Sequence, residues 1–318
     1  MISLDEVRRA AEVIAGEAVR TPVVGAYDLD TLAGATVLAK DESLQRTGSF
    51  KFRGAFNRVS AIPLDERHLG VVAVSSGNHG AAVACAAEIL GLEATIHVPA
   101  DVAPAKRDLI EGFGARIVTF DRSTPDREAA ARQQVETTGA TFVHPFEDRL
   151  VMAGQGTAAL ELHEQAGPVD VLVVPMSGGG LMAGCGSAMR QLRPECELIG
   201  VEPAAADDTR RSFAAGRPVS IAQPTTIADG LAITAPGEQT FEINRRLVAE
   251  VVTVTDEQLV EAMRLGSRLF GRRYEPSGVA GLAAVVADPA RWRGRRVGVL
   301  LTGGNIDAAR FDELTSTE

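Results

Sequence analysis

The 318-residue sequence lacks three features that would each have indicated a class of protein. Its only cysteines, Cys85, Cys185 and Cys196, have no CxxC or zinc-type spacing, which favours a reduced compartment. No apolar run reaches the roughly 18 residues that a transmembrane helix needs. The net charge of −10 comes without a basic tail or patch, so nucleic acid and anionic membranes are not expected as partners.

The chain starts with an acidic amphipathic stretch, MISLDEVRRAAEVIAG, in which Ser3 and Glu6 have the spacing of a capping box. This stretch predicts a helix and not a signal peptide. Apolar residues make up 45% and charged residues 23% of the sequence, as is typical of soluble globular proteins. We therefore expect a soluble, cytoplasmic protein.

From about residue 68 onward, short runs of branched apolar residues alternate with helical segments. The expected strands cover residues 70–76, 93–99, 115–120, 140–145, 169–175, 197–203 and 295–301. This alternation predicts the α/β class, with two lobes that are each a mostly parallel twisted sheet covered by helices. We assign residues 63–148 to a small domain, and residues 1–62 and 149–318 to a large domain.

Three loops beyond the ends of expected strands have unusual composition, and this is where open α/β sheets bind ligands. SSGNHG, residues 75–80, suits a carboxylate or another anion at a helix amino terminus, with an ordinary capped turn as the alternative. SGGGL, residues 177–181, lets consecutive N–H groups face one anion, which indicates a phosphate. TGGNID, residues 302–307, by itself favours an ordinary turn.

Lys51 stands between Phe50 and Phe52, at the start of an expected helix. The helix dipole and the aromatic neighbours both lower the pKa of an amine there, which makes it a better nucleophile. In isolation, a side chain that extends past the aromatic rings to solvent would be the simpler interpretation. Together with the phosphate and carboxylate loops, Lys51 predicts a pyridoxal phosphate site.

Six motifs in order resemble the pyridoxal phosphate enzymes of the serine/threonine dehydratase and serine racemase family, which have fold type II. The motifs are TGSFKFRGA, SSGNHG, SGGGL, VEPAAADD, TIADG and LTGGNID. The resemblance extends from about residue 15 to residue 312 and is highly specific as a set. It implies a fold similar to the tryptophan synthase β chain, with the cofactor in the cleft between the two lobes.

The resemblance implies that Lys51 binds the cofactor covalently and later moves the α-proton of the substrate. Around the cofactor it places Phe50, Asn78, Gly178, Gly179, Gly180, Leu181 and Thr302. Phe50 would pack on the pyridine ring, Asn78 would bond the 3′-oxygen, and the glycine loop would hold the phosphate. A hydroxyl from Thr302 beside the ring nitrogen leaves it largely unprotonated, which suits elimination of a β-hydroxyl.

For the substrate carboxylate, the resemblance implies a site made of Ser75, Ser76, Asn78 and His79. It also matches Ser76 with the acid–base residue of racemases, on the face opposite the lysine. Arg127 corresponds to an arginine that some relatives place near the substrate. A solvated position on the helix PDREAAARQQ is an equal alternative for Arg127.

The motif VEPAAADD matches a divalent-cation site in the family, with Glu202, the Ala206 carbonyl and Asp208 as ligands. Oxygen ligands completed by waters suit Mg²⁺, Ca²⁺ or Mn²⁺. Acidic residues at a helix amino terminus are the alternative interpretation. Such a metal would be structural or activating, because the chemistry belongs to the cofactor.

Two positions depart from the family pattern. Ser177 stands where many members have a fourth glycine, and Thr302 where they have Ser or Cys. The chain also ends shortly after TGGNID, so we do not expect the carboxy-terminal regulatory domain of biosynthetic threonine dehydratases.

The predicted activity is that of an ammonia-lyase (EC 4.3.1.-) that converts a β-hydroxy-α-amino acid, by default L-threonine or L-serine, to a 2-oxo acid. A serine racemase and a 3-hydroxyaspartate dehydratase or racemase are the close alternatives. A non-catalytic pyridoxal phosphate-binding protein is more remote, because a pure binder needs no carboxylate pocket. A synthase acting on O-activated serine is disfavoured, since such relatives carry GNTG in place of SSGNHG. The expected assembly is a homodimer.

Overall fold

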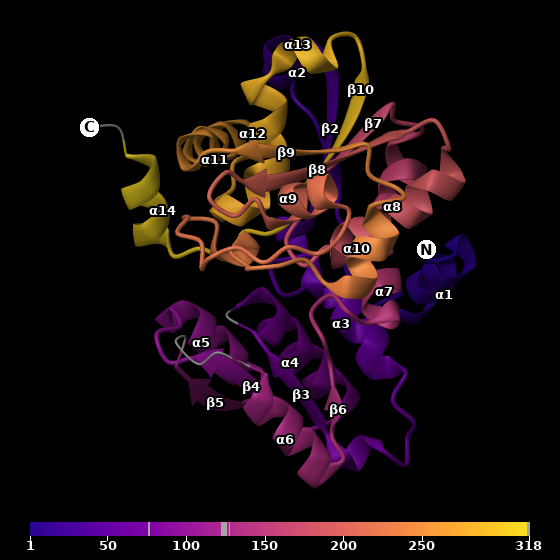
Figure 1. Ribbon diagram of the computed structural model, residues 1–318, viewed down its shortest axis with the longest axis vertical. Coiled ribbons are helices and arrows are strands. Elements are labelled where there is room, and N and C mark those ends of the chain that lie inside the picture. Colours follow the sequence, from indigo (N-terminus) through magenta and orange to yellow (C-terminus); the bar gives the residue numbers. More distant parts are fainter. Residues whose placement is uncertain (76, 122–125, 127, 317–318) are drawn as a thin grey trace.

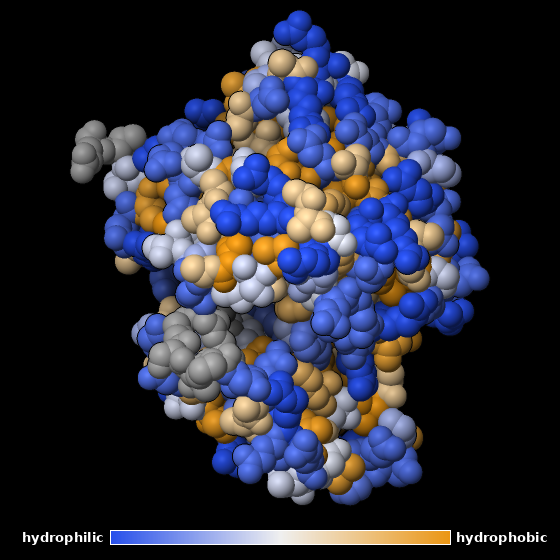
Figure 2. All heavy atoms as spheres, in the orientation of Figure 1, coloured by the Kyte–Doolittle hydropathy of each residue, from blue (hydrophilic) through white to orange (hydrophobic). Residues whose placement is uncertain are grey.

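A computed structural model describes residues 1–75, 77–121, 126 and 128–316 (Figure 1). Two separate sheets organise the chain, and Figure 1 shows them as an upper and a lower lobe. Figure 2 shows a largely hydrophilic face whose surface is hollowed between the two lobes. Among the described residues, we find no helix with the length and hydropathy to cross a membrane.

The larger sheet has six strands in the order β1-β2-β10-β7-β8-β9. Its strands are β1 (Val23–Val24), β2 (Thr36–Asp41), β7 (Val171–Pro175), β8 (Glu197–Pro203), β9 (Glu250–Val254) and β10 (Arg296–Leu301). Every pairing is parallel except that of β1 with β2. This sheet is therefore mostly parallel, as the sequence predicts.

The smaller sheet has four parallel strands in the order β5-β4-β3-β6. Its strands are β3 (Val71–Val74), β4 (Ala94–Pro99), β5 (Arg116–Phe120) and β6 (Thr141–Phe142). The predicted α/β class with two helix-covered sheets is confirmed. The domain boundaries at residues 62/63 and 148/149 stay a prediction.

Fourteen helices are named in the described part of the chain. They are α1 (Leu4–Val13), α2 (Tyr27–Ala33), α3 (Lys51–Ser60), α4 (Asn78–Leu90), α5 (Pro104–Gly112), α6 (Ala129–Thr138), α7 (Arg149–Ala166), α8 (Gly180–Leu192), α9 (Asp208–Ala215), α10 (Glu238–Asn244), α11 (Asp256–Phe270), α12 (Ala280–Ala287), α13 (Pro289–Trp292) and α14 (Ala308–Thr315). Short 3₁₀ helices cover Glu42–Leu44 (η1), Arg67–Leu69 (η2), Asp229–Leu231 (η3) and Pro276–Val279 (η4).

Local sequence explains where several helices begin and end. The capping box predicted at Ser3 and Glu6 opens α1, with the Ser3 N–H donating to the Glu6 carboxylate at 2.8 Å. Asp148 caps α7 by accepting from the first N–H groups of the helix. Gly91 ends α4 in the left-handed conformation, at φ 72°, which other residues rarely adopt.

Side chains of alternate residues in the central strands are buried on opposite faces of the larger sheet. Val171, Val173 and Val299 join a core with residues of α11 and α12, whereas Leu172 and Leu300 join a second core with residues of α7 and α8. Complete burial of each such side chain contributes about 1.5–3 kcal/mol. Helices therefore cover both faces, which leaves the strand ends as the place for a polar site.

The helix that carries Lys51 lies at the junction of the two lobes (Figure 1). α3 packs against α4 and α7. Its residues Phe52, Phe56 and Val59 share a hydrophobic core with the strands of the smaller sheet. The position of Lys51 thus depends on packing from both lobes.

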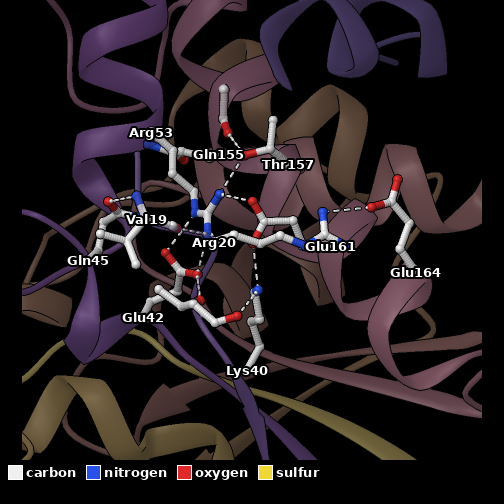
Figure 3. A network of polar contacts seen from close by, with 12 residues as sticks. Val19, Arg20, Lys40, Glu42, Gln45, Arg53, Gln155, Thr157, Glu161 and Glu164 are labelled. Atoms are coloured by element: carbon white, nitrogen blue, oxygen red, sulfur yellow. Dashed lines mark hydrogen bonds and ion pairs between the residues drawn. The ribbon is translucent and has the colours of Figure 1, made fainter. Parts of the chain in front are cut away.

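A buried network of charges fixes α3 two residues beyond Lys51 (Figure 3). The Arg53 guanidinium donates to Glu42 at 2.7 and 2.8 Å and to Glu161 at 2.7 and 2.9 Å. Lys40 Nζ donates to the same Glu161 at 2.6 Å. Burial alone would raise the pKa of Glu42, but the charge and hydrogen bonds of Arg53 hold that pKa below its usual value. The network therefore ties β2, α3 and α7 together.

Replacing Arg53 by Met is expected to destabilise the protein by about 3–5 kcal/mol, because it leaves buried carboxylates without their cation. The matched control is Arg20→Met. Arg20 pairs with Glu164 at the surface, where side chains are 54% and 45% exposed, and such a pair contributes at most about 1 kcal/mol. Urea denaturation of the two variants measures the difference. Equal losses of unfolding free energy would contradict this account.

Candidate active site

Lys51 is the first residue of α3, and its side chain is partly buried. The Nζ atom donates to the Pro145 carbonyl at 2.9 Å and lies 5.1 Å from the centre of the Phe50 ring. Burial lowers the pKa of Lys51 to about 8. The predicted desolvated lysine at a helix start is confirmed. Of its two aromatic neighbours only Phe50 lies beside the amine, because Phe52 turns into the core.

The glycine loop has no room for larger residues. A Cβ atom on Gly178 would lie 2.2 Å from the Phe146 ring, and one on Gly180 would lie 2.8 Å from the same side chain. Gly179 has a φ of 88°. The loop leads directly into α8, whose amino terminus offers N–H groups that no carbonyl within the helix accepts. Such a site suits a phosphate.

Helix α10 fixes the glycine loop through side chains near both of its ends. Thr240 Oγ1 donates to the Gly178 carbonyl at 2.5 Å, and Asn244 Nδ2 donates to the Gly179 carbonyl at 3.0 Å. The Glu147 carboxylate accepts from the N–H groups of Gln239 and Thr240. With the carbonyl groups of Gly178 and Gly179 bonded to α10, the loop has a defined orientation.

The segment HPFED, residues 144–148, contacts both Lys51 and the glycine loop. The sequence analysis did not assign these residues to the site. Pro145 accepts from Lys51, and the neighbouring Phe146 covers the glycines. A signal was present, because this segment follows β6 at its carboxyl end, as the three loops analysed above follow their strands.

A hydrogen-bonded group surrounds Asn78, the first residue of α4. Asn78 Nδ2 donates to Glu275 Oε1 at 2.6 Å, and Asn78 Oδ1 accepts from Asn305 Nδ2 at 2.8 Å. Burial raises the pKa of Glu275 to about 7. Sequence reasoning assigned neither Glu275 nor Asn305, although Asn305 lies in the motif TGGNID. No local pattern marks Glu275, because its partner is distant in sequence.

Thr302 lies beside the turn that precedes Lys51. The Thr302 carbonyl accepts from the Phe50 N–H at 3.1 Å, and Ser49 forms an isolated bridge with Gly303. Leu181, at the start of α8, is buried in the core next to the same sheet. The structure thus brings the end of β10 next to the start of α3.

The loop predicted to hold a carboxylate is described in part. Ser75 Oγ accepts from the Gly77 N–H at 3.0 Å. His79 bonds the Val143 carbonyl through Nε2 at 2.8 Å, and burial lowers its pKa to about 3, so its imidazole is neutral. A carboxylate could therefore reach the main-chain N–H of His79 in the first turn of α4. Ser76 and Arg127 lie outside the described residues.

Glu202 and Asp208 form a second polar cluster at the end of β8. Glu202 accepts from the N–H groups of Thr209 and Arg210, at 2.9 and 3.0 Å. Asp208 is buried, and among the described residues neither of its carboxylate oxygens has a hydrogen-bond partner. Burial and the charge of Glu202 raise the pKa of Asp208 to about 8, and burial raises that of Glu202 to about 7.

Two desolvated carboxylates of this kind fit a cation that would neutralise them. In the part of the chain that is described, no group of three or more His, Cys, Asp or Glu side chains could hold a metal ion. A cation at Glu202 and Asp208 would therefore need carbonyl groups, such as that of Ala206, and waters to complete its ligands.

The site combines a desolvated lysine with a glycine loop at a helix amino terminus, and it lies at the junction of two sheets. These three features indicate a class of enzyme. They are the parts of an α/β enzyme that binds a phosphorylated aldehyde through a lysine. The comparisons with known proteins lead to the same class.

The family described as pyridoxal-phosphate dependent enzyme matches residues 14–303. The L-threo-3-hydroxyaspartate ammonia-lyase of Pseudomonas sp is 46% identical over 312 residues, which are 98% of each protein. The structure of maize serine racemase has a TM-score of 0.94 at 36% identity, covering 98% of this chain and 96% of that one. The serine racemase from Dictyostelium discoideum has a TM-score of 0.89 at 35% identity, covering 96% and 99%.

This chain therefore belongs to the pyridoxal-phosphate dependent enzyme family. The resemblance to fold type II dehydratases and serine racemases that the sequence motifs predicted is confirmed.

Proposed function

We propose that this chain is a pyridoxal phosphate-dependent ammonia-lyase that acts on β-hydroxy-α-amino acids. The observation that carries the proposal is the buried amine of Lys51, with its pKa lowered to about 8. At pH 7 about a tenth of an amine with that pKa is uncharged, compared with less than about a thousandth at the usual lysine pKa of about 10.4. Only the uncharged form is a nucleophile or a base. Relatives described as ammonia-lyases of hydroxy amino acids support the choice of substrate class.

Lys51 would bind the cofactor covalently, and the glycine loop at the start of α8 would hold its phosphate. The other residues proposed to contact the cofactor are Phe50, Asn78, Leu181 and Thr302. When bound, the cofactor withdraws electrons from the α-carbon of the amino acid, which makes the α-proton removable.

In this proposal the Nζ atom of Lys51 accepts the α-proton, and the protein around it excludes water. Ser75, Asn78 and the N–H groups at the start of α4 orient the substrate carboxylate. The β-hydroxyl leaves as water, one water is then taken up, and ammonia and a 2-oxo acid are released. Ser76 and Arg127 stay predicted substrate residues.

The racemase alternative needs a second proton-moving group on the face opposite Lys51. The sequence assigns that role to Ser76, and relatives described as serine racemases support it as the second candidate. Racemisation and elimination start with the same α-proton, so one enzyme can perform both. The products therefore separate the two functions.

A product assay with the holoenzyme tests the function. L-Threonine, L-serine and L-threo-3-hydroxyaspartate are assayed for ammonia and 2-oxo acid, with chiral chromatography of the remaining amino acid. At least one substrate is expected to yield equal amounts of ammonia and 2-oxo acid. Lys51→Ala is expected to lower that rate at least about a hundredfold, because it removes the base.

Two results would refute the proposal. The first is near-normal turnover by a folded Lys51→Ala variant. The second is that none of the three substrates yields any 2-oxo acid. In that case, D-serine as the sole product from L-serine would favour the racemase.

The proposal includes a divalent cation, Mg²⁺, Ca²⁺ or Mn²⁺, bound by Glu202, the Ala206 carbonyl and Asp208. Its support is the buried Asp208 carboxylate described above, which has a raised pKa. The neighbouring Asp207 is different, because it pairs with Arg210 and Arg211 at 2.9 and 2.7 Å. Asp207 thus already has its counter-charges.

Removal of divalent cations with EDTA is expected to lower the thermal unfolding midpoint, and each of the three ions is expected to restore it. At about 100 times the dissociation constant, a bound ion adds about 2.7 kcal/mol of stability. Asp208→Asn is expected to abolish this response, and Asp207→Asn is expected to keep it. A wild-type midpoint that responds to neither EDTA nor the ions would exclude the site.

We also propose, on the resemblance alone, a homodimer in the cytoplasm and a two-domain division at residues 62/63 and 148/149. The three cysteines are buried free thiols, which is compatible with a reduced compartment.

A further inference from the structure

Lys106 lies against the loop proposed to hold the substrate carboxylate. It belongs to the first turn of α5 in the smaller lobe, and its side chain is only 16% exposed. A Cβ atom built on Gly77 would lie 3.0 Å from Lys106 Cδ and 3.3 Å from Lys106 Nζ. Gly77 directly precedes Asn78, so the ammonium group lies at the edge of the proposed substrate site.

A cavity of about 500 Å³ between the lobes extends from Lys106 to the neighbours of Asn78. Its lining includes Glu275 and Asn305, the two residues that bond Asn78. Lys106 and Arg310 are the cationic side chains among the described lining residues, and Arg310 pairs with Glu313 at 2.7 Å. Lys106 is therefore the cation next to the loop.

The position of Lys106 is unfavourable for a cation that serves only the fold. The first turn of a helix carries the positive end of the helix dipole, which disfavours added positive charge. The chain has only three lysines, and the other two, Lys40 and Lys51, lie in the Arg53 network and at the candidate cofactor site. The dipole and the ammonium would both stabilise a carboxylate placed between them.

The structure contains a carboxylate that binds Lys106. The Asp229 side chain, from η3 of the larger lobe, pairs with Lys106 Nζ across the cavity. Asp229 is 51% exposed, so water can solvate its carboxylate once a ligand carboxylate takes over the ion pair with Lys106. A ligand carboxylate could therefore replace Asp229 at small cost.

We propose that Lys106 recognises the β-carboxylate of the substrate, so that the preferred substrate class is a dicarboxylic β-hydroxy-α-amino acid such as 3-hydroxyaspartate. This inference rests on the proposed function. The α-carboxylate of such a substrate would bind the loop that contains Gly77. Its second carboxylate is attached to the β-carbon, which is the neighbour of the α-carbon. L-Serine and L-threonine have no charged group there, so they gain nothing from Lys106.

The competing interpretation is a latch, in which the Lys106–Asp229 pair only holds the two lobes together. A latch would affect every substrate alike, whereas a recognition residue changes the ratio between substrates. The two interpretations also differ for Asp229. Recognition does not need its carboxylate, but a latch does.

The test compares kcat/KM for L-threo-3-hydroxyaspartate with kcat/KM for L-serine in the holoenzyme. Lys106→Gln is expected to lower the ratio of the two values about 10- to 150-fold, because it removes a charged hydrogen bond of about 1.5–3 kcal/mol. Lys106→Arg is expected to retain most of the preference, since it keeps the charge. Asp229→Asn is expected to leave the ratio unchanged or to raise it.

An unchanged ratio in Lys106→Gln would overturn the proposal. So would equal losses for both substrates in Lys106→Gln and Asp229→Asn, which is the result that a latch predicts.

A binding measurement keeps this inference separate from the proposed function. Succinate has two carboxylates on a four-carbon chain, and butyrate has one. Calorimetric titration is expected to show that Lys106→Gln lowers the affinity for succinate relative to butyrate at least tenfold. If the enzyme releases no 2-oxo acid but this selectivity is present, only the proposed function fails. If turnover is present and the selectivity is absent in the wild type, only the role of Lys106 fails.

Discussion

The burial of the Lys51 amine at the start of α3 is the constraint on which the rest of this structure depends. Two cations stand two residues apart on that helix, and their surroundings differ. Burial alone would lower the pKa of Arg53, but the carboxylates of Glu42 and Glu161 raise it above its usual range. For Lys51 the hydrogen-bond acceptor is the Pro145 carbonyl, and burial lowers its pKa. The paired cation anchors the helix so that the desolvated amine next to it is held in place.

A single topological rule explains where the remaining groups come from. The loops after β3, β6, β7 and β10 supply Asn78, Pro145, the glycines and Thr302. All four strands belong to parallel pairings, and the carboxyl ends of parallel strands lie at one edge of a sheet. Two sheets that face each other with these edges can therefore enclose one site. A change in the position of either lobe would alter the site without changing any residue in it.

The sequence predicted well those features that depend on neighbours along the chain. The strands β3, β4 and β7 have continuous branched apolar residues, and the Lys51 helix and the glycine loop have local signatures. β2 escaped prediction because it ends in Lys40 and Asp41, which are buried only through distant partners such as Glu161 and Tyr274. Glu275 and Lys106 were missed for the same reason. Their roles come from contacts with Asn78 and Gly77 that folding alone creates.

The most direct measurement is the capture of pyridoxal phosphate by the cofactor-free protein, stopped with borohydride at pH values from about 6 to about 11.5, a range that spans both the lowered and the usual lysine pKa, and mapped by peptide mass spectrometry. Of the three lysines, the account predicts that Lys51 alone carries the cofactor. It also predicts that the capture rate rises with pH around a midpoint near the lowered pKa of about 8, because the uncharged amine reacts. Cofactor fixed to Lys40, to Lys106 or to no lysine would contradict the account, as would a midpoint near the usual lysine pKa of about 10.4.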